Sequence, residues 1–293
     1  MPSPVLIIND LDLIKDVAIK QFQSFPNRQI PNIFKVKPWN ANLLSVRGDQ
    51  WKHVRGILSP TFSSGKLKKM VPAVQRVVSN LVNNVTEKAK TGEMIELKEF
   101  CGWFAMDVIA GVVFGLQRFS DFLQLLVEAE KEQEAQQEKP ADYSTANELV
   151  YLDMCLNEAL RMFPPGFYTM RESIEDTEVG GYKVPKGMRA IFPFYAIHID
   201  PEIWPNPTKY DPERHTPEAR ATRHPCSFLP FGIGPRNCIG MRLAQLELRM
   251  ALAAVLQRVT PVLCEKSVYP PKSFEFGRIT STDGVWVKFQ LRD

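Results

Sequence analysis

One cysteine of this sequence stands in a setting that suits metal or nucleophilic chemistry. Cys238 lies in a glycine-rich stretch, "FLPFGIGPRNCIG" at residues 228–240, and a segment with helical periodicity follows at once. Backbone N–H groups at a helix N-terminus stabilise a thiolate. Gly232 and Gly234 let the backbone fold tightly and approach a flat or bulky ligand. Arg236, two residues before the sulfur, can neutralise an anionic group on that ligand.

Three other roles are conceivable for Cys238. A zinc site needs further soft ligands, and the neighbouring sequence supplies none. A nucleophilic cysteine needs a base, for which His215 and His224 are the candidates. Taken alone, the pattern also fits an inert cysteine buried after a turn.

The composition is that of a globular protein. The chain has 293 residues, 44% of them hydrophobic and 24% charged, with a net charge of +3. This charge is too small to indicate nucleic-acid binding, and Lys66, Lys68 and Lys69 are interpreted as a solvated helix face. The five cysteines are scattered, which argues against a disulfide framework and favours a reducing compartment.

The sequence predicts no membrane anchor. Its most apolar run, residues 101–116, is short and contains Asp107, so we interpret it as a buried core helix. Residues 1–16 carry acidic residues soon after a brief apolar patch and resemble neither a signal peptide nor an anchor.

Helical periodicity dominates the first part of the chain. Residues 45–59 predict a short helix that places Trp51 and Arg55 on one face, four residues apart. Residues 66–116 predict two helices separated by a turn at 90–94. Residues 117–143 begin amphipathic and end charged, which is typical of an exposed helix end or a linker.

A well-delimited helix follows, in the stretch "STANELVYLDMCLNEALRMFPP". Thr145 and Glu148 form a capping box, and two prolines end the helix. Glu158 and Arg161 lie three apart on one face. The predicted buried stripe consists of Leu149, Leu152, Leu156, Ala159, Leu160 and Phe163.

The remaining sequence predicts small β-structures around an irregular segment. Turn signals flank β-rich pieces in residues 177–198, and the proline-dense residues 200–225 predict a meander. A long helix runs from Cys238 to about Val259, and residues 280–293 resemble a hairpin arm with an Asp-Gly turn.

The cysteine stretch resembles a known signature. "FGIGPRNCIG" matches the haem-binding pattern of the cytochrome P450 superfamily, F-x-x-G-x-R-x-C-x-G, at Phe231, Gly234, Arg236, Cys238 and Gly240. The pattern is long and specific, so the chain is identified as similar to this family.

Three further stretches resemble motifs of that family, in its order. Trp51 and Arg55 match W-x-x-x-R, and Glu158 with Arg161 matches E-x-x-R. Residues 198–215 resemble the approach to P-E-R-F, with His215 where phenylalanine is usual. The resemblance covers most of residues 1–117 and all of 145–293. It is greatest to the family 3 enzymes and thromboxane synthase.

The resemblance implies a mainly α fold with a small β-sheet region, haem as the cofactor, and binding of that cofactor by the matched residues of the cysteine stretch. Cys238 would be the metal ligand, as the proximal thiolate of the iron. Trp51, Arg55 and Arg236 would pair with the haem propionates, because a guanidinium suits a carboxylate. Glu158 and Arg161, together with Arg214 from the meander, would have a structural role.

The sequence departs from the family pattern in several places. The distal helix with its acid–threonine pair is not found, so no catalytic residue is identified. The nearest match, Asp176-Thr177, stands in a turn context. Tyr168 stands where relatives carry a propionate-pairing arginine, and Arg171 follows three residues later. We therefore expect one shortened, incomplete cytochrome P450 domain over 1–293, with internal deletions near 117–145.

The resemblance implies a haem-thiolate monooxygenase that oxidises a lipophilic small molecule. O2 and electrons from NADPH-cytochrome P450 reductase would drive the reaction, at the cytosolic face of the endoplasmic reticulum membrane with peripheral membrane contact. Lys52, Arg242 and Arg249 are candidate reductase contacts, with a solvated face as the alternative. Two alternative functions are a thromboxane synthase-like isomerase of lipid endoperoxides and a catalytically inactive truncated product.

Overall fold

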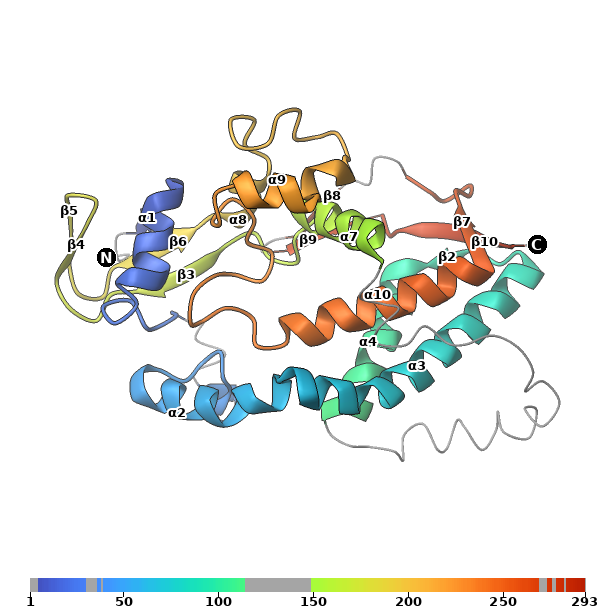
Figure 1. Cartoon of the computed structure of the whole chain (residues 1–293), viewed down its shortest axis with the longest axis horizontal. Helices are drawn as coiled ribbons and strands as arrows, with labels where there is room; N and C mark the ends of the chain where they lie inside the picture. Colours follow the sequence, from blue (N-terminus) through green and yellow to red (C-terminus); the bar gives the residue numbers. More distant parts are fainter. Residues whose placement is uncertain are drawn as a thin grey trace. The chain divides into compact units, whose positions relative to one another are not determined.

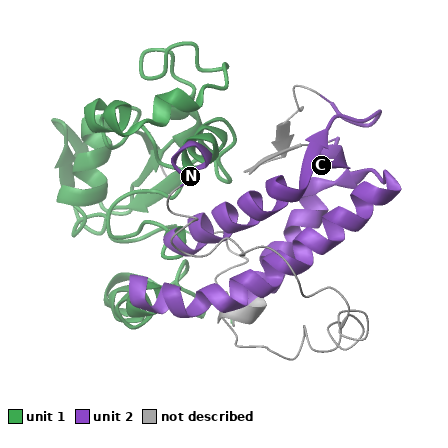
Figure 2. Ribbon diagram, turned by 45° about the vertical axis from the view of Figure 1, so that its right-hand side comes forward, with its two compact units in different colours: residues 1–62, 153–241, 275–280 green, residues 63–152, 242–274, 281–293 purple. Residues whose placement is uncertain are grey.

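The computed structural model describes most of the chain. The described residues are 5–29, 36–37, 39–113, 149–268, 273–275, 278–281 and 283–292. The chain divides into two compact units, coloured green and purple in Figure 2. Unit 1 comprises residues 1–62, 153–241 and 275–280, and unit 2 comprises 63–152, 242–274 and 281–293. The single domain expected from the sequence stays a prediction, and the deletions expected near 117–145 lie outside the described residues.

Unit 1 is built around a three-stranded sheet of order β1-β6-β3. Strand β6 (Arg189–Phe192) lies in the middle, parallel to β1 (Val5–Ile7) and antiparallel to β3 (Thr169–Glu172). The antiparallel pair β4 (Thr177–Val179) and β5 (Tyr182–Val184) forms a separate hairpin. These strands confirm the β-rich pieces that the turn signals delimit.

Unit 1 also contains short helical elements, several of which are labelled in Figure 1. They are α1 (Leu11–Lys15), the π-helical η1 (Asp16–Lys20), η3 (Trp39–Ala41), α2 (Gly48–Leu58), η4 (Ser59–Phe62), α8 (Phe194–His198), η6 (Pro212–His215) and α9 (Pro217–Thr222), with most of α7 (Val150–Met162). Local capping explains several boundaries: the Asp10 carboxylate accepts from the Leu13 N–H at the start of α1, and Thr216 caps α9 before a proline.

One apolar cluster forms the core of unit 1. It joins α1, η1 and the strands to the segment that precedes the cysteine loop. Its buried members are Ile8, Ile14, Val17, Ala18, Phe25, Val179, Val184, Ala190, Phe192, Phe194, Ile197, Cys226 and Leu229.

Unit 2 contains the long helices α3 (Ser64–Thr91), α4 (Leu97–Val113) and nearly all of α10 (Met241–Arg258). Gly92, with a positive φ of 66°, ends α3 in a left-handed cap, as the predicted turn at 90–94 requires. The sheet of this unit has the order β2-β10-β7, formed by Ile95–Glu96, Trp286–Leu291 and Val259–Val262. Its core consists of Val85, Ile95, Val255, Val259, Val287 and Phe289.

Strands β8 (Ser273–Glu275) and β9 (Arg278–Ser281) form a two-stranded sheet. The predicted hairpin over 280–293 is therefore wrong in its pairing. Gly284 has the positive φ of a turn, but β10 after it pairs antiparallel with β2 and β7 instead of with β9. Pairing with β2 and β7 buries Val287 and Phe289 in the unit 2 core, and this burial stabilises the strand.

The burial pattern of α7 also differs from the prediction. Its buried residues are Met154, Asn157, Glu158 and Arg161, whereas Phe163 of the predicted apolar stripe is 43% exposed. The helix buries its polar face because that face finds hydrogen-bond partners in the meander. The capping box of Thr145 and Glu148 lies outside the described residues.

The fold class is confirmed: the architecture is mainly α with small sheets. The apolar run that begins at Cys101 is helical in α4 but is not the buried core helix expected, because Trp103 and Met106 are 68% and 62% exposed. Within the described ranges, no helix combines the length and apolarity that a membrane crossing requires.

Substitution of two helical isoleucines, one buried and one exposed, tests the assigned core of unit 1. Ile14 on α1 has no exposed surface, whereas Ile57 on α2 is 61% exposed. We expect Ile14→Ala to lower the free energy of unfolding by about 3 kcal/mol, because it leaves a cavity. Ile57→Ala serves as the matched control and should change it by less than about 1 kcal/mol. Urea unfolding measures both, and equal effects would contradict the assigned core.

Candidate functional site

The cysteine loop is shaped by two consecutive reverse turns in unit 1. The Gly232 N–H donates to the Leu229 carbonyl at 3.0 Å, and the Asn237 N–H donates to the Gly234 carbonyl at 3.0 Å. Gly232 and Gly234 have φ angles of 74° and 72°, in the left-handed region where a side chain is strained. The two glycines are therefore required by the backbone itself.

These turns present Cys238 on the surface. Its own N–H donates to the Phe231 carbonyl at 2.8 Å, and the residue is exposed with a free thiol. The structure thus rejects the inert buried cysteine. No histidine is hydrogen-bonded to Cys238 in the described part of the chain, because His215 pairs with Glu158 and His224 contacts Asp12.

Gly234 also sets the distance between the cysteine loop and η1. A Cβ atom added at Gly234 would lie 2.1 Å from the carbonyl oxygen of Ala18, which is far inside van der Waals contact. At Gly240 the nearest atom, on the Phe62 ring, is 4.0 Å away. Chain packing therefore requires glycine at position 234 and leaves space at position 240.

Arginines from distant segments bind the carbonyl groups of the loop. Arg28 donates to the Arg236 carbonyl at 2.6 Å, and Arg171 on β3 donates to the Ile233 carbonyl at 3.2 Å. Arg55 on α2 contacts both the carbonyl and the side-chain oxygen of Asn237, at 3.1 and 2.9 Å. Three guanidinium groups are therefore hydrogen-bonded to the loop.

Arg236 is held inside this cluster by an aromatic ring. Its guanidinium carbon lies 4.3 Å from the centroid of the Trp51 ring, and its Nη2 donates to the Val46 carbonyl at 2.9 Å. Trp51 is itself buried and packs on Phe22, with ring centroids 5.5 Å apart. The cation–π contact orients Arg236 without neutralising it.

The arginine cluster (Arg28, Arg55, Arg171 and Arg236) has an excess of positive charge. Burial, with the charges of neighbouring arginines, lowers the pKa of Arg171 and of Arg236 to about 9. Burial likewise lowers the pKa of Arg28 and Arg55, while the Cys238 sulfur acts in the opposite direction on both. Among the described residues, no carboxylate is hydrogen-bonded to the cluster.

Several buried N–H groups of the arginine cluster have no partner among the described residues. They are the Nε atoms of Arg28 and Arg171, and the Nε and Nη1 atoms of Arg236. Buried donors and charges without partners are costly. An anionic ligand with carboxylate groups would satisfy them and would offset the mutual repulsion of the arginines.

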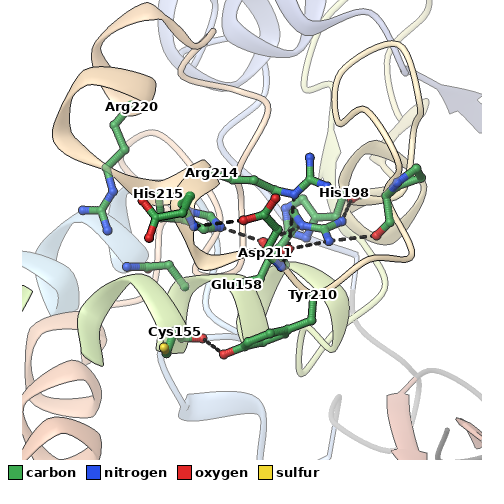
Figure 3. A network of polar contacts seen from close by, with 12 residues as sticks. Cys155, Glu158, His198, Tyr210, Asp211, Arg214, His215 and Arg220 are labelled. Carbon is green, nitrogen blue, oxygen red and sulfur yellow. Dashed lines mark hydrogen bonds and ion pairs between the residues drawn. The ribbon is translucent and has the colours of Figure 1, made fainter. Parts of the chain in front are cut away.

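A second polar network lies on the buried face of α7 (Figure 3). Arg161 donates to both oxygens of Glu158 at 2.8 Å, in a bidentate pair with no exposed surface. The Asp211 N–H and His215 Nε2 bind the same carboxylate, each at 3.0 Å. Arg214 Nε lies 3.4 Å from it. One helix residue thus holds the start of η6 and its end.

Arg161 extends this network to other turns of the meander. Its Nη1 donates to the His198 carbonyl at 2.6 Å and its Nη2 to the Pro207 carbonyl at 2.8 Å. Although burial alone raises the pKa of Glu158, the hydrogen bonds from Arg161, His215 and the Asp211 N–H lower it to about 2. Glu158 is therefore ionised at neutral pH.

The chain belongs to the cytochrome P450 family, whose members are haem-thiolate monooxygenases. The sequence profile of the family, described as "Cytochrome P450", matches residues 1–121 and 122–285. The chain is therefore classed as an oxidoreductase with haem as its cofactor.

Curated relatives refine this placement. The chain is 27% identical to human cytochrome P450 3A7 over 422 aligned positions, which cover 99% of the chain and 83% of the relative. It is 27% identical to rat cytochrome P450 3A1 with the same coverages, and 27% identical to mouse cytochrome P450 3A25 over 92% of the chain and 79% of the relative. Because 422 aligned positions exceed the 293 residues of the chain, many positions of the relative have no counterpart here. The expected shortening is confirmed.

The residues present fit a haem group. The exposed Cys238 thiol supplies one soft ligand, and the partnerless N–H groups of the arginine cluster suit the two propionates. Sequence reasoning identified Arg236 and Arg55 but missed Arg28, which lies outside every motif. It also left Arg171 open, and the structure brings Arg171 to the loop while Tyr168 is exposed.

Asp176 and Thr177, the nearest match to the distal acid–threonine pair, lie at the start of β4. Thr177 begins β4, and the Asp176 carboxylate accepts from the Lys186 N–H at 2.7 Å. This pair therefore fixes a turn, as its sequence context predicts.

Gly234→Ala tests the close packing of the cysteine loop against η1. The added methyl group would meet the Ala18 carbonyl and occupy a left-handed backbone position, so we expect a loss of stability of about 2 kcal/mol or more. In the helix interior of α2, Gly56→Ala meets nothing within 4 Å and should be neutral or stabilising. Thermal unfolding of both variants decides, and a fully stable Gly234→Ala protein would refute the packing.

Glu158→Gln tests the buried carboxylate. The pKa of Glu158 is about 2 in the folded chain against 4.5 ordinarily, so its contribution to stability is complete above pH 4.5 and is lost as the pH falls toward 2. We expect the variant to lose about 3 kcal/mol at neutral pH and to show a flatter acid-unfolding profile. The exposed Glu202→Gln should retain the wild-type profile. Unchanged stability of Glu158→Gln would exclude a structural role.

Proposed function

We propose that Cys238 is the proximal thiolate ligand of the haem iron. The observation that carries this proposal is the pairing of an exposed thiol with a cationic cluster whose buried N–H groups lack partners. The negative charges of a thiolate and two propionates together would neutralise the positive charges of the arginine cluster. Gly240, where a Cβ meets nothing closer than 4.0 Å, leaves the backbone open to a flat ligand.

The arginine cluster and Trp51 divide two roles in this proposal, which are binding of the propionates and support of the groups that bind them. Arg28, Arg171 and Arg236 pair with the propionates through their partnerless N–H groups. Trp51 holds the Arg236 guanidinium in place, and Arg55 fixes the backbone next to the cysteine through Asn237.

Phe231 and Glu158 position the loop without contacting the ligand. The Phe231 carbonyl binds the Cys238 N–H, which orients the sulfur. Glu158, Arg161 and Arg214 fix the meander that precedes the loop, so the structural role expected for them from the sequence is retained. When bound, haem supplies the redox chemistry for oxygen activation.

The proposed reaction is monooxygenation of a lipophilic small molecule. Electrons would come from NADPH-cytochrome P450 reductase, at the cytosolic face of the endoplasmic reticulum membrane with peripheral contact. Family membership and the similarity to the cytochrome P450 3A enzymes support this reading. A reductase contact through Lys52, Arg242 or Arg249 stays a prediction.

Cys238→Ser tests the iron ligand. We expect the wild-type chain, supplied with haem, to give the thiolate-type spectrum of the reduced carbon-monoxide complex, and the serine variant to lose it because a hydroxyl is not ionised at neutral pH. Cys264→Ser, at a cysteine outside the loop, is the matched control and should keep the wild-type spectrum. Identical spectra for wild type and Cys238→Ser would refute the assignment.

A turnover assay separates the proposed activity from its alternatives. Product formation that needs NADPH, reductase and O2 supports monooxygenation. Rearrangement of a lipid endoperoxide without NADPH would instead identify an isomerase. Stoichiometric haem with neither activity would identify a catalytically inactive chain.

A further inference from the structure

His215, which replaces the phenylalanine expected at the end of the P-E-R-F-like stretch, takes part in the Glu158 network. It ends η6 and is 1% exposed, and its Nε2 lies 3.0 Å from Glu158 Oε2 (Figure 3). Its ring also packs on Trp204, with ring centroids 5.6 Å apart. A phenylalanine could make the ring contact but could not bind the carboxylate.

The partners of Glu158 determine which nitrogen of His215 carries a proton. The carboxylate is ionised, so it can only accept hydrogen bonds. Arg161 Nη2 and the Asp211 N–H bind Oε1, while Arg161 Nε and His215 Nε2 bind Oε2. His215 must therefore donate from Nε2, and it supplies the second hydrogen bond to Oε2.

His198 has the opposite arrangement. Its Nε2 accepts from the Leu229 N–H at 2.8 Å, and a backbone amide can only donate. The Nε2 of His198 therefore carries no proton. The His198 carbonyl accepts from Arg161, so this residue links the same network to the first residues of the cysteine loop.

The Phe228 ring closes the connection between the two histidines. Its centroid lies 5.1 Å from that of His215 and 5.5 Å from that of His198. Phe228 directly precedes Leu229, whose carbonyl begins the first turn of the loop. The entry to the loop is thus held by a hydrogen bond at Leu229 and by ring packing at Phe228.

We propose that His215 is a positioning residue for the cysteine loop. By donating Nε2–H to Glu158 and packing on Phe228, it transmits the fixed geometry of the buried carboxylate to the segment that presents Cys238. The two buried histidines act as opposite tautomers, with the proton on Nε2 in His215 and on Nδ1 in His198. This inference deepens the proposed function, but its test does not require bound haem.

Hydrogen exchange across residues 226–240 of the full chain tests the proposal. His215→Phe keeps a ring of similar shape but removes the donor, so we expect exchange in this segment to rise about tenfold, since a hydrogen bond to a charged group contributes roughly that factor. His215→Gln places an amide donor near the Nε2 position and should restore most of the protection. His53→Phe, at an exposed position on α2, should leave the segment unchanged.

The outcomes separate positioning from simple space filling. Protection that is kept in His215→Phe, or lost equally in the glutamine variant, would overturn the proposal. The tautomers are measured independently in the wild-type chain by long-range ¹H–¹⁵N NMR, with His215 assigned by its loss in the variants. A proton on Nδ1 of His215 would also overturn it, even if His215→Phe does not fold. Because neither readout involves iron, a negative result is distinct from failure of Cys238 as the haem ligand.

Discussion

The architecture of unit 1 depends on one buried carboxylate. Glu158 has no exposed surface, yet it is ionised, because Arg161, His215 and the Asp211 N–H satisfy it and Arg214 lies nearby. An ion in such a place is tolerated only when its lone pairs are filled. The irregular meander therefore cannot move away from α7 without leaving a charge buried and unpaired, and this constraint fixes a segment that has few regular hydrogen bonds of its own.

The two charged networks of unit 1 differ in composition. Around Glu158, both carboxylate oxygens are hydrogen-bonded within the chain, while Arg214 Nε and the Nδ1 atoms of His198 and His215 have no hydrogen-bond partner among the described residues. Around Cys238, guanidinium groups converge on loop carbonyls, repel one another and keep buried N–H groups without partners. The difference lies in the charges: the first network contains a carboxylate that pairs with its arginines, whereas the arginine cluster has no carboxylate among the described residues and suits an anionic ligand.

The two networks are connected through short segments of chain. Arg161 binds the His198 carbonyl, the His198 ring accepts from Leu229, and Leu229 begins the turns that lead to Cys238. A chain of hydrogen bonds therefore links α7 to the segment that precedes Cys238. The same connection explains why an aromatic residue that can also donate a hydrogen bond is suited to position 215.

The sequence by itself determined the features that depend on local chemistry. The turn glycines around Cys238 and the helical pairs Trp51–Arg55 and Glu158–Arg161 follow from spacing and turn requirements, and the mainly α class follows from the resemblance of these stretches to family motifs. Tertiary structure alone decided the features that need distant segments to meet. It buried Glu158 and Arg161 of α7 more deeply than the apolar stripe, which is half-buried apart from the exposed Phe163. It also paired β10 with β2 and β7 instead of a local partner, and brought Arg28 and Arg171 to the loop. Periodicity records which residues share a face, but it carries no information on which distant donors will satisfy a buried charge.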